Sequence, residues 1–242
     1  MPRIACAGRS DVGRHRSNNE DALLMRPDLG FVALADGMGG AASGEVASAI
    51  FMEAAFQVFS ERSPQSSGTA VDLVQKAFLR ANERIMNKAR QDPRHTGMGC
   101  TAELLAFDDQ TYIVGHVGDS RTYLLRDGRL RQITKDHSMV QEQIDKGLIT
   151  QEEAKTHSMR SVIMRAVGVN ETLAIDLIRG KAQSGDLFLL CSDGLSDMVG
   201  DDGLLDTLSL SIDLQGRVEK LIDSANRAGG YDNITVALCL IE

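Results

Sequence analysis

Three segments of the chain carry apolar residues at steps of three and four, the spacing that places them on one face of a helix. The first follows Ser43 and runs to about residue 62, the second follows Thr69, and the third ends at Gly229-Gly230. Serine and threonine are typical of helix N-caps, and glycine of helix ends. The apolar faces consist of Ala47, Ile50, Phe51, Ala54, Ala55 and Val58; of Val71, Val74, Phe78, Ala81 and Ile85; and of Leu214, Val218, Leu221, Ile222 and Ala225. Since each helix has one apolar face, each is expected to cover a sheet.

Short apolar runs bounded by turn residues predict the strands. The runs at residues 101–107, 111–116 and 122–125 are separated by Asp108-Asp109 and Asp127-Gly128, and we expect them to form an antiparallel meander. Further strands are predicted at residues 4–7, 30–34, 172–178, 187–190 and 234–241, with Asp36 at the end of the second. Paired helices and strands in meanders favour an α+β fold with sheets at the centre and helices outside.

The segment at residues 138–162 has a different pattern, with many charged residues and two short polar helices. The first helix is expected from Ser138 to Lys146, where Gly147 ends it. The second begins after Thr150, with Glu153 in the position that completes a capping box. We expect this segment to form a mobile surface flap.

Composition limits the class of protein. The 242 residues, 43% of them hydrophobic, suffice for one core, and no linker divides them, so a single domain over residues 1–242 is expected. Residues 63–68 are rich in turn formers and are expected to join two helices. The net charge of −8 argues against a nucleic acid as partner. No apolar run has membrane-spanning length and residues 1–4 do not resemble a signal peptide, so a cytoplasmic location is expected.

The cysteines give no sign of a metal or redox motif. None forms a C-x-x-C pair, and each lies in or beside an apolar run. They are therefore expected to be buried thiols in a reducing compartment. The four are Cys6, Cys100, Cys191 and Cys239.

Aspartates in short glycine-bearing turns after apolar runs are the strongest chemical signal: Asp36, Asp119, Asp193 and Asp232. A further acidic pair, Glu20-Asp21, lies near the N-terminus. Side chains at strand ends can converge although they are far apart in sequence, and converging carboxylates repel one another unless cations neutralise them. The pattern indicates a site for several hard divalent cations, and therefore metal-assisted chemistry on phosphate.

Each motif also has a plainer interpretation. Aspartate and glycine are common turn residues, so each aspartate by itself is compatible with a tight turn. Asp119 has an arginine two positions on, Arg121, with which it could form a local ion pair. Residues 18–21 by themselves are compatible with a solvated loop. It is the joint pattern that favours the metal site.

The order and spacing of these motifs resemble the PPM-type (type 2C) metal-dependent serine/threonine protein phosphatases, above all their compact bacterial members. The resemblance covers nearly the whole chain. It is carried by residues 16–21, 35–40, 44–45, 97–101, 117–121, 134–138, 165–168, 192–195 and 232–235, which read RSNNED, ADGMGG, GE, GMGCT, VGDSR, TKDHS, RAVG, SDGL and DNIT. It implies a four-layer α/β/β/α sandwich in which two central antiparallel sheets are flanked by helix pairs.

The resemblance also implies the ligands of two tightly bound Mn²⁺ or Mg²⁺ ions. Asp36 would bridge both ions. Asp193 and Asp232 would complete the protein ligands of the first, with Asp21 holding one of its waters. The second would have Glu20, through water, and the backbone carbonyl of Gly37. All-oxygen ligation favours Mn²⁺ or Mg²⁺ over zinc.

Further roles follow from the same resemblance. Asp119, together with Asp193, would hold a weaker third ion. Arg16 would clamp the substrate phosphate, and Asn233 would support the preceding aspartate. Some relatives carry a histidine, proposed as the general acid, where this chain has Met38, which has no proton to donate. A water on the third ion would then protonate the leaving oxygen.

The implied activity is hydrolysis of phosphoserine and phosphothreonine in proteins, by attack of a hydroxide that bridges the metals. Implied partners are phosphorylated proteins and a cognate bacterial serine/threonine kinase, whose action the enzyme would reverse; a monomer is expected. The flap would shape the choice of protein substrate. Two other classes stay open: a non-catalytic phosphopeptide-binding module, which would be expected to have lost a ligand, and a phosphatase for small phosphorylated metabolites.

Overall fold

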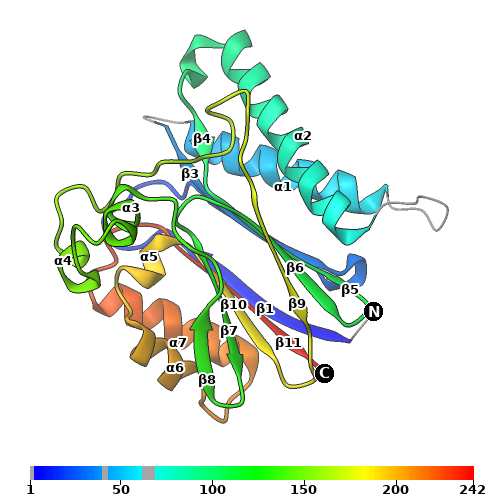
Figure 1. The fold of residues 1–242 in the computed structure, drawn as a ribbon, viewed down its shortest axis with the longest axis vertical. Helices are drawn as coiled ribbons and strands as arrows, with labels where there is room; N and C mark the ends of the chain where they lie inside the picture. Colours follow the sequence, from blue (N-terminus) through cyan, green and yellow to red (C-terminus); the bar gives the residue numbers. More distant parts are fainter. Residues whose placement is uncertain (1–2, 40–42, 62–68) are drawn as a thin grey trace.

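Two antiparallel sheets lie between two layers of helices in the computed structural model, which describes residues 3–39, 43–61 and 69–242 (Figure 1). The strands are β1 (Ile4–Asp11), β2 (Asp21–Arg26), β3 (Phe31–Met38), β4 (Gly99–Cys100), β5 (Ala102–Asp108), β6 (Thr111–Val117), β7 (Arg121–Arg126), β8 (Arg129–Gln132), β9 (Asp176–Lys181), β10 (Leu187–Cys191) and β11 (Ile234–Ile241). One sheet has the order β1-β11-β10-β7-β8, and the other β2-β3-β5-β6-β9 with β4 paired to β3.

The α-helices are α1 (Gly44–Ser60), α2 (Ala70–Gln91), α3 (Met139–Asp145), α4 (Gln151–Lys155), α5 (Asp193–Ser196), α6 (Asp201–Leu208) and α7 (Leu214–Arg227). Short 3-10 helices lie at Pro27–Leu29 and Pro93–His95. Helices α1 and α2 cover the β2-containing sheet, while α5, α6 and α7 cover the other (Figure 1). The expected four-layer α+β sandwich is thus confirmed. Among the described residues, no helix combines the length and apolar character that a membrane crossing requires.

Apolar side chains fill all three spaces between the layers. Between the sheets, Phe107 and Tyr112 of one sheet meet Phe188 of the other edge to face, with ring centroids 5.7 and 5.0 Å away. Phe51 of α1 packs in the same manner on Phe78 of α2. Most inward positions are apolar, and the buried polar residues Glu103, His116 and Thr122 are hydrogen-bonded to one another.

Local signals in the sequence set the helix starts as predicted. The Thr69 hydroxyl accepts from the backbone N–H of Asp72, whose carboxylate accepts from the Thr69 N–H, and Thr150 and Glu153 form the same capping box. Ser43 differs, because it occupies the N-cap position of α1 while its hydroxyl donates to the carbonyl of Arg94 at 3.0 Å. Residues 63–68, predicted to join two helices, and Gly40 of the first aspartate motif lie outside the described residues.

Three strand predictions are wrong in detail. The expected meander is correct for β5 and β6, which pair antiparallel, but β7 belongs to the other sheet, so the chain changes sheets at residues 118–120. Strand β3 does not end at Asp36 but continues to Met38, since β4 pairs with Gly37 and Met38. The strand predicted at residues 172–178 lies instead at Asp176–Lys181, the stretch that pairs with β6.

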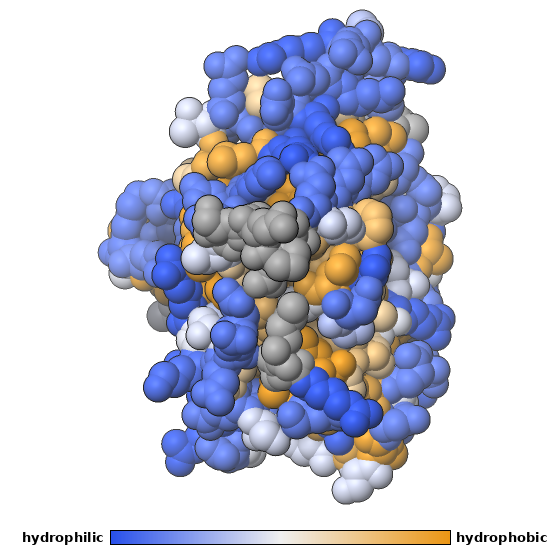
Figure 2. Space-filling model, turned by 90° about the vertical axis from the view of Figure 1, so that its right-hand side faces the viewer, coloured by the Kyte–Doolittle hydropathy of each residue, from blue (hydrophilic) through white to orange (hydrophobic). Residues whose placement is uncertain are grey.

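The two ends of the molecule differ in character. The surface seen from the side where β1 begins and β11 ends is mainly hydrophilic, with apolar patches between the polar side chains (Figure 2). The opposite end carries α3, α4 and α5 and the segments that hold the aspartates (Figure 1).

Candidate functional site

Asp21 and Asp36 face one another as direct partners across β2 and β3. Asp21 also connects the two sheets, because its Oδ2 accepts from the hydroxyl of Ser192 at 2.9 Å and from that of Thr235 at 2.6 Å. The backbone N–H of Asp36 is held by the Thr101 hydroxyl at 3.3 Å. The cross-strand register thus places two carboxylates side by side where the two sheets meet.

Asp193 and Asp232 come from the other sheet. Asp193 is the first residue of α5, directly after β10, and its Oδ1 is buried without a hydrogen-bond partner. Asp232 lies between α7 and β11, where its Oδ2 accepts from Nη2 of Arg16 at 2.7 Å. Arg16 therefore lies beside the carboxylates, as a phosphate clamp requires.

Asn233 ties the N-terminal loop to β11. Its Oδ1 accepts from the backbone N–H of Glu20 at 2.8 Å, and its Nδ2 donates to the carbonyls of Val12 and Asn18 at 3.0 and 2.9 Å. Its own backbone N–H donates to Oδ1 of Asp232 at 2.8 Å. Support of the aspartate thus comes from the Asn233 backbone, while the amide side chain positions the loop that bears Glu20.

Gly37 is enclosed so closely that no side chain fits. A Cβ at this position would lie 2.2 Å from the carbonyl oxygen of Gly44. The backbone N–H of Gly37 donates to the carbonyl of Glu20 at 3.1 Å. The Glu20 carboxylate lies against Gly44 at the start of α1, because a Cβ on Gly44 would lie 2.5 Å from Oε2 of Glu20. The backbone of Gly37 and the Glu20 carboxylate therefore share one narrow space.

Asp119 lies where the chain passes from β6 to β7. Its side chain is 8% exposed, and its Oδ1 is buried without a partner. Arg121 does not pair with it, because its guanidinium binds both carboxylate oxygens of Asp136, the nearest at 2.7 Å. The local ion pair considered as an alternative for Asp119 is therefore wrong.

Burial and, after it, mutual repulsion raise the pKa values of these carboxylates. Burial, followed by the charges of the neighbouring aspartates 21, 193, 119 and 232, raises the pKa of Asp36 well above its usual value. Burial also raises the pKa of Asp21 to about 6, against the hydrogen bonds from Thr235 and Ser192. For Asp119, burial and the charge of Asp136 raise the pKa to about 7. The five aspartates are electrostatic neighbours although they come from five segments.

The arrangement fits divalent cations. Among the described residues, no three His, Cys, Asp or Glu side chains enclose a single point as a finished metal site. Yet the carboxylates of Asp21, Asp119 and Asp193 each keep one buried oxygen without a hydrogen bond. Buried carboxylate oxygens that repel one another and lack donors are the oxygen ligands that hard cations take.

Asp197 is a neighbour that the sequence reasoning missed. It caps the C-terminus of α5, four residues after Asp193, and its charge helps to raise the pKa of both Asp193 and Asp119. Its own pKa is raised by withdrawal from solvent, against the cations of Arg121 and Arg160. The i, i+4 spacing would have revealed it if a helix had been predicted after β10. A surface hollow of about 390 Å³ lies apart from these aspartates and is lined by residues of α2.

A four-layer sandwich with buried, mutually repelling carboxylates where its two sheets meet, and an arginine beside them, is the arrangement that metal-assisted chemistry on phosphate requires. The chain belongs to the protein phosphatase 2C family, whose model matches residues 8–219.

Its relatives include two bacterial phosphatases. The chain is 42% identical over 232 residues to the serine/threonine protein phosphatase PstP of Mycobacterium tuberculosis, covering 96% of this chain but only 44% of PstP. It is 35% identical over 238 residues to the protein phosphatase PhpP of Streptococcus pneumoniae, covering 95% of this chain and 94% of PhpP. The chain thus spans less than half the length of PstP and nearly all of PhpP.

Solved structures agree with the fold. The crystal structure of M. tuberculosis PstP/Ppp matches with a TM-score of 0.92 and 40% identity, over 99% of both chains. The catalytic domain of PstP in complex with two manganese ions matches with a TM-score of 0.89 and 39% identity, over 98% of both chains.

Proposed function

We propose that this chain is a metal-dependent phosphatase that removes phosphate from phosphoserine and phosphothreonine in proteins. The observation that carries the proposal is the set of mutually repelling aspartates with unpartnered carboxylate oxygens and Arg16 beside them. Membership of the protein phosphatase 2C family and the names of the relatives support the same activity.

The proposed ligands belong to two tightly held ions, Mn²⁺ or Mg²⁺. Asp36 would bridge them, Asp193 and Asp232 would serve the first, and Asp21 would hold one of its waters. The second would take the Gly37 carbonyl and, through water, Glu20. When bound, such ions lower the pKa of a water and neutralise phosphoryl oxygens. The two manganese ions in the PstP catalytic domain support this number and this metal.

Arg16 would orient the substrate. Its planar guanidinium donates paired hydrogen bonds to phosphoryl oxygens, and its 2.7 Å contact with Asp232 places it within reach of a phosphate at the carboxylates. Asp119 with Asp193 would hold a weaker third ion. The carboxylate oxygen of Asp119 that has no hydrogen-bond partner supports this role. The side chain of Met38 has no proton to donate to the leaving oxygen, which leaves that task to a water on the third ion.

The wider setting follows from the same reasoning. We propose one domain over residues 1–242, because β1 and β11, the first and last strands, are hydrogen-bonded neighbours. The protein would act as a monomer against a serine/threonine kinase. The four cysteines are free thiols, which supports a reducing compartment such as the cytoplasm.

Release of phosphate from a phosphothreonine peptide, with Mn²⁺ and with EDTA, tests the function. Activity should require the metal and vanish in the chelator. A sugar phosphate in the same assay distinguishes the alternative, since a metabolite phosphatase would prefer it. Full activity in EDTA, or with zinc alone, would contradict the two-metal proposal.

The metal-free protein should lose stability between about pH 4 and about pH 7. A carboxyl whose pKa is higher in the folded protein than in the unfolded chain stabilises the fold while it is protonated. That contribution is complete below about 3.8 and is lost as the pH passes about 6 for Asp21 and about 7 for Asp119. The melting temperature in EDTA should therefore fall as pH rises, and fall much less with saturating Mn²⁺. A melting temperature in EDTA that does not change with pH would show that the pKa values of these carboxyls are not raised in the folded protein.

Residues 138–162 form the proposed flap. Its two ends are joined by a bridge between Ser138 and Ile163 and by the N–H of Met139 donating to the Val162 carbonyl at 2.9 Å. Three of its large apolar side chains are exposed, namely Leu148, Met159 and Val162. Arg160 brings positive charge toward Asp197. A segment closed at its base and open at its tip is suited to contact a protein substrate.

Replacing residues 147–158 by a short Gly-Ser turn should therefore lower kcat/KM for a phosphopeptide by about tenfold or more. Turnover of an aryl phosphate should stay within about twofold, because it needs no contact beyond the carboxylates and Arg16. Lys155→Ala, on the exposed surface of α4, serves as the control for a change of charge alone. Equal losses on both substrates would reduce the flap to a structural insert.

A further inference from the structure

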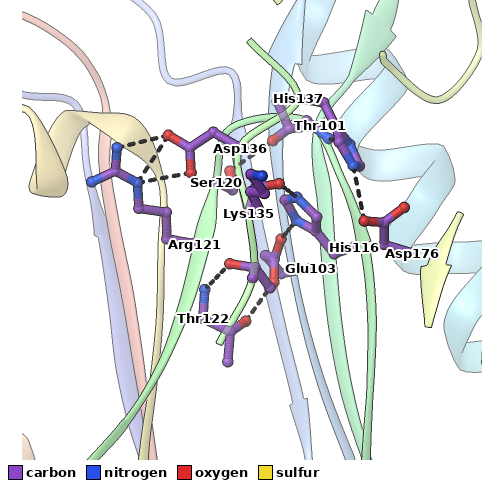
Figure 3. Close-up of polar contacts among 12 residues, drawn as sticks. Thr101, Glu103, His116, Ser120, Arg121, Thr122, Lys135, Asp136, His137 and Asp176 are labelled. Carbon is purple, nitrogen blue, oxygen red and sulfur yellow. Dashed lines mark hydrogen bonds and ion pairs between the residues drawn. The ribbon is translucent and has the colours of Figure 1, made fainter. Parts of the chain in front are cut away.

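A buried polar network lies beneath the turn that carries Asp119 (Figure 3). Glu103 of β5, His116 of β6 and Thr122 of β7 are all fully buried. One oxygen of the Glu103 carboxylate contacts Nδ1 of His116, and the other accepts from the Thr122 hydroxyl. Nε2 of His116 donates to the carbonyl of Lys135 at 2.8 Å. Burial lowers the pKa of His116, but the Glu103 charge and hydrogen bond outweigh it and raise that pKa, and both ring nitrogens face oxygen atoms.

His137 stacks on this network and holds the Asp119 turn. Its ring lies 4.5 Å from the His116 ring, and its side chain is 8% exposed. Its backbone N–H donates to the Gly118 carbonyl at 2.7 Å, while its Nδ1 accepts from the Gly118 N–H at 3.1 Å. Nε2 faces the carboxylate of Asp176 at 3.3 Å (Figure 3) and also lies 3.1 Å from Nη1 of Arg165. Burial, His116 and Arg165 lower the pKa of His137 to about 4, so the ring is neutral near pH 7.

The turn has little freedom on its other side. Gly118 has a φ of +115°, and a Cβ there would lie 2.5 Å from Cβ of Thr101. The Thr101 hydroxyl bonds to that of Ser120 at 2.7 Å. Asp119 thus lies between two anchored residues, and the His137 ring supplies the side-chain anchor on Gly118.

His137 also touches the base of the flap. Its carbonyl accepts from the N–H of Met164 at 2.6 Å, and the next residue, Ser138, bridges to Ile163. The same residue therefore contacts the Asp119 turn through its ring and both chain ends of the flap through its backbone.

We propose that His137 is a positioning residue whose Nδ1 holds the Gly118 amide, directs the Asp119 carboxylate toward its metal ion and links that carboxylate to the base of the flap. The inference rests on the proposed function, because it assigns His137 a task in the third metal site. The network of Glu103 and His116 supplies the rigid surface on which the ring stacks.

Two substitutions of nearly equal polarity test this. In His137→Asn the amide oxygen takes the place of Nδ1 and can accept from Gly118, whereas in His137→Gln it takes the place of Nε2 and leaves the Gly118 N–H without an acceptor. Calorimetric titration with Mn²⁺ should show a weak site with wild-type affinity in the Asn variant and about tenfold weaker affinity in the Gln variant. The tight sites should be unchanged in both.

Kinetics and hydrogen exchange complete the experiment. The Gln variant should lose kcat with unchanged KM for an aryl phosphate, and its Gly118 amide should exchange faster than in the wild type without any metal present. Equal weak-site affinity and equal Gly118 exchange in the two variants would overturn the proposal. A wild-type protein that is inactive with Mn²⁺ would instead overturn the proposed function, while the exchange measurement would still test the Gly118 contact.

Discussion

Asp36→Ala is expected to lower kcat at least about a thousandfold on aryl phosphates and phosphopeptides alike. Asp36 faces Asp21 across β2 and β3, and its pKa is raised by burial and by four neighbouring aspartates. It is the residue proposed to touch both tight ions, so its loss should remove the activated water and the neutralisation of the phosphate together. Calorimetry should show both tight sites weakened.

The loss should not come from unfolding. Because the variant removes a buried carboxylate from a repulsive group, its melting temperature in EDTA should equal or exceed that of the wild type. Asp206→Ala, on the exposed side of α6, is the matched loss of one negative charge and should keep wild-type kcat. Near-normal kcat in Asp36→Ala would assign the bridge to another residue.

Asp119→Ala should lower kcat for a phosphothreonine peptide by about a hundredfold, the usual contribution of a positioned proton donor. The affinity of the two tight ions and KM should stay as in the wild type, while the weak metal site disappears from the titration. The effect should be smaller for an aryl phosphate, since a phenolate leaves without full protonation.

The structural alternative makes the opposite forecast. If Asp119 only stabilised its turn, the variant would melt at a lower temperature and keep its kcat. Arg121 is already bound to Asp136, so no ion pair is lost with Asp119. Unchanged kcat together with an unchanged metal titration would leave the third ion without a role.

The sequence predicted the elements whose signals are local. The helix starts at Thr69 and Thr150 follow from side chains within three residues of the cap, and α7 follows from its apolar periodicity and the glycines after it. The sequence also singled out the five aspartates, because each stands in a short motif. Their roles came from the order of the motifs along the chain and the resemblance that this order supports.

Only the tertiary structure decided which elements are neighbours. Alternation of apolar residues shows that β6 and β7 are buried but not that they belong to different sheets, since both pair through backbone groups that every residue carries. The crossover places Asp119 beside strands from both sheets, and the register places Asp21 opposite Asp36. The contact between His137 and Gly118 is of the same kind, because it joins residues 19 positions apart through a ring nitrogen. The sequence by itself therefore determined the chemical groups and the local elements. Long-range pairing determined the distances between these groups and the environments that shift their pKa values.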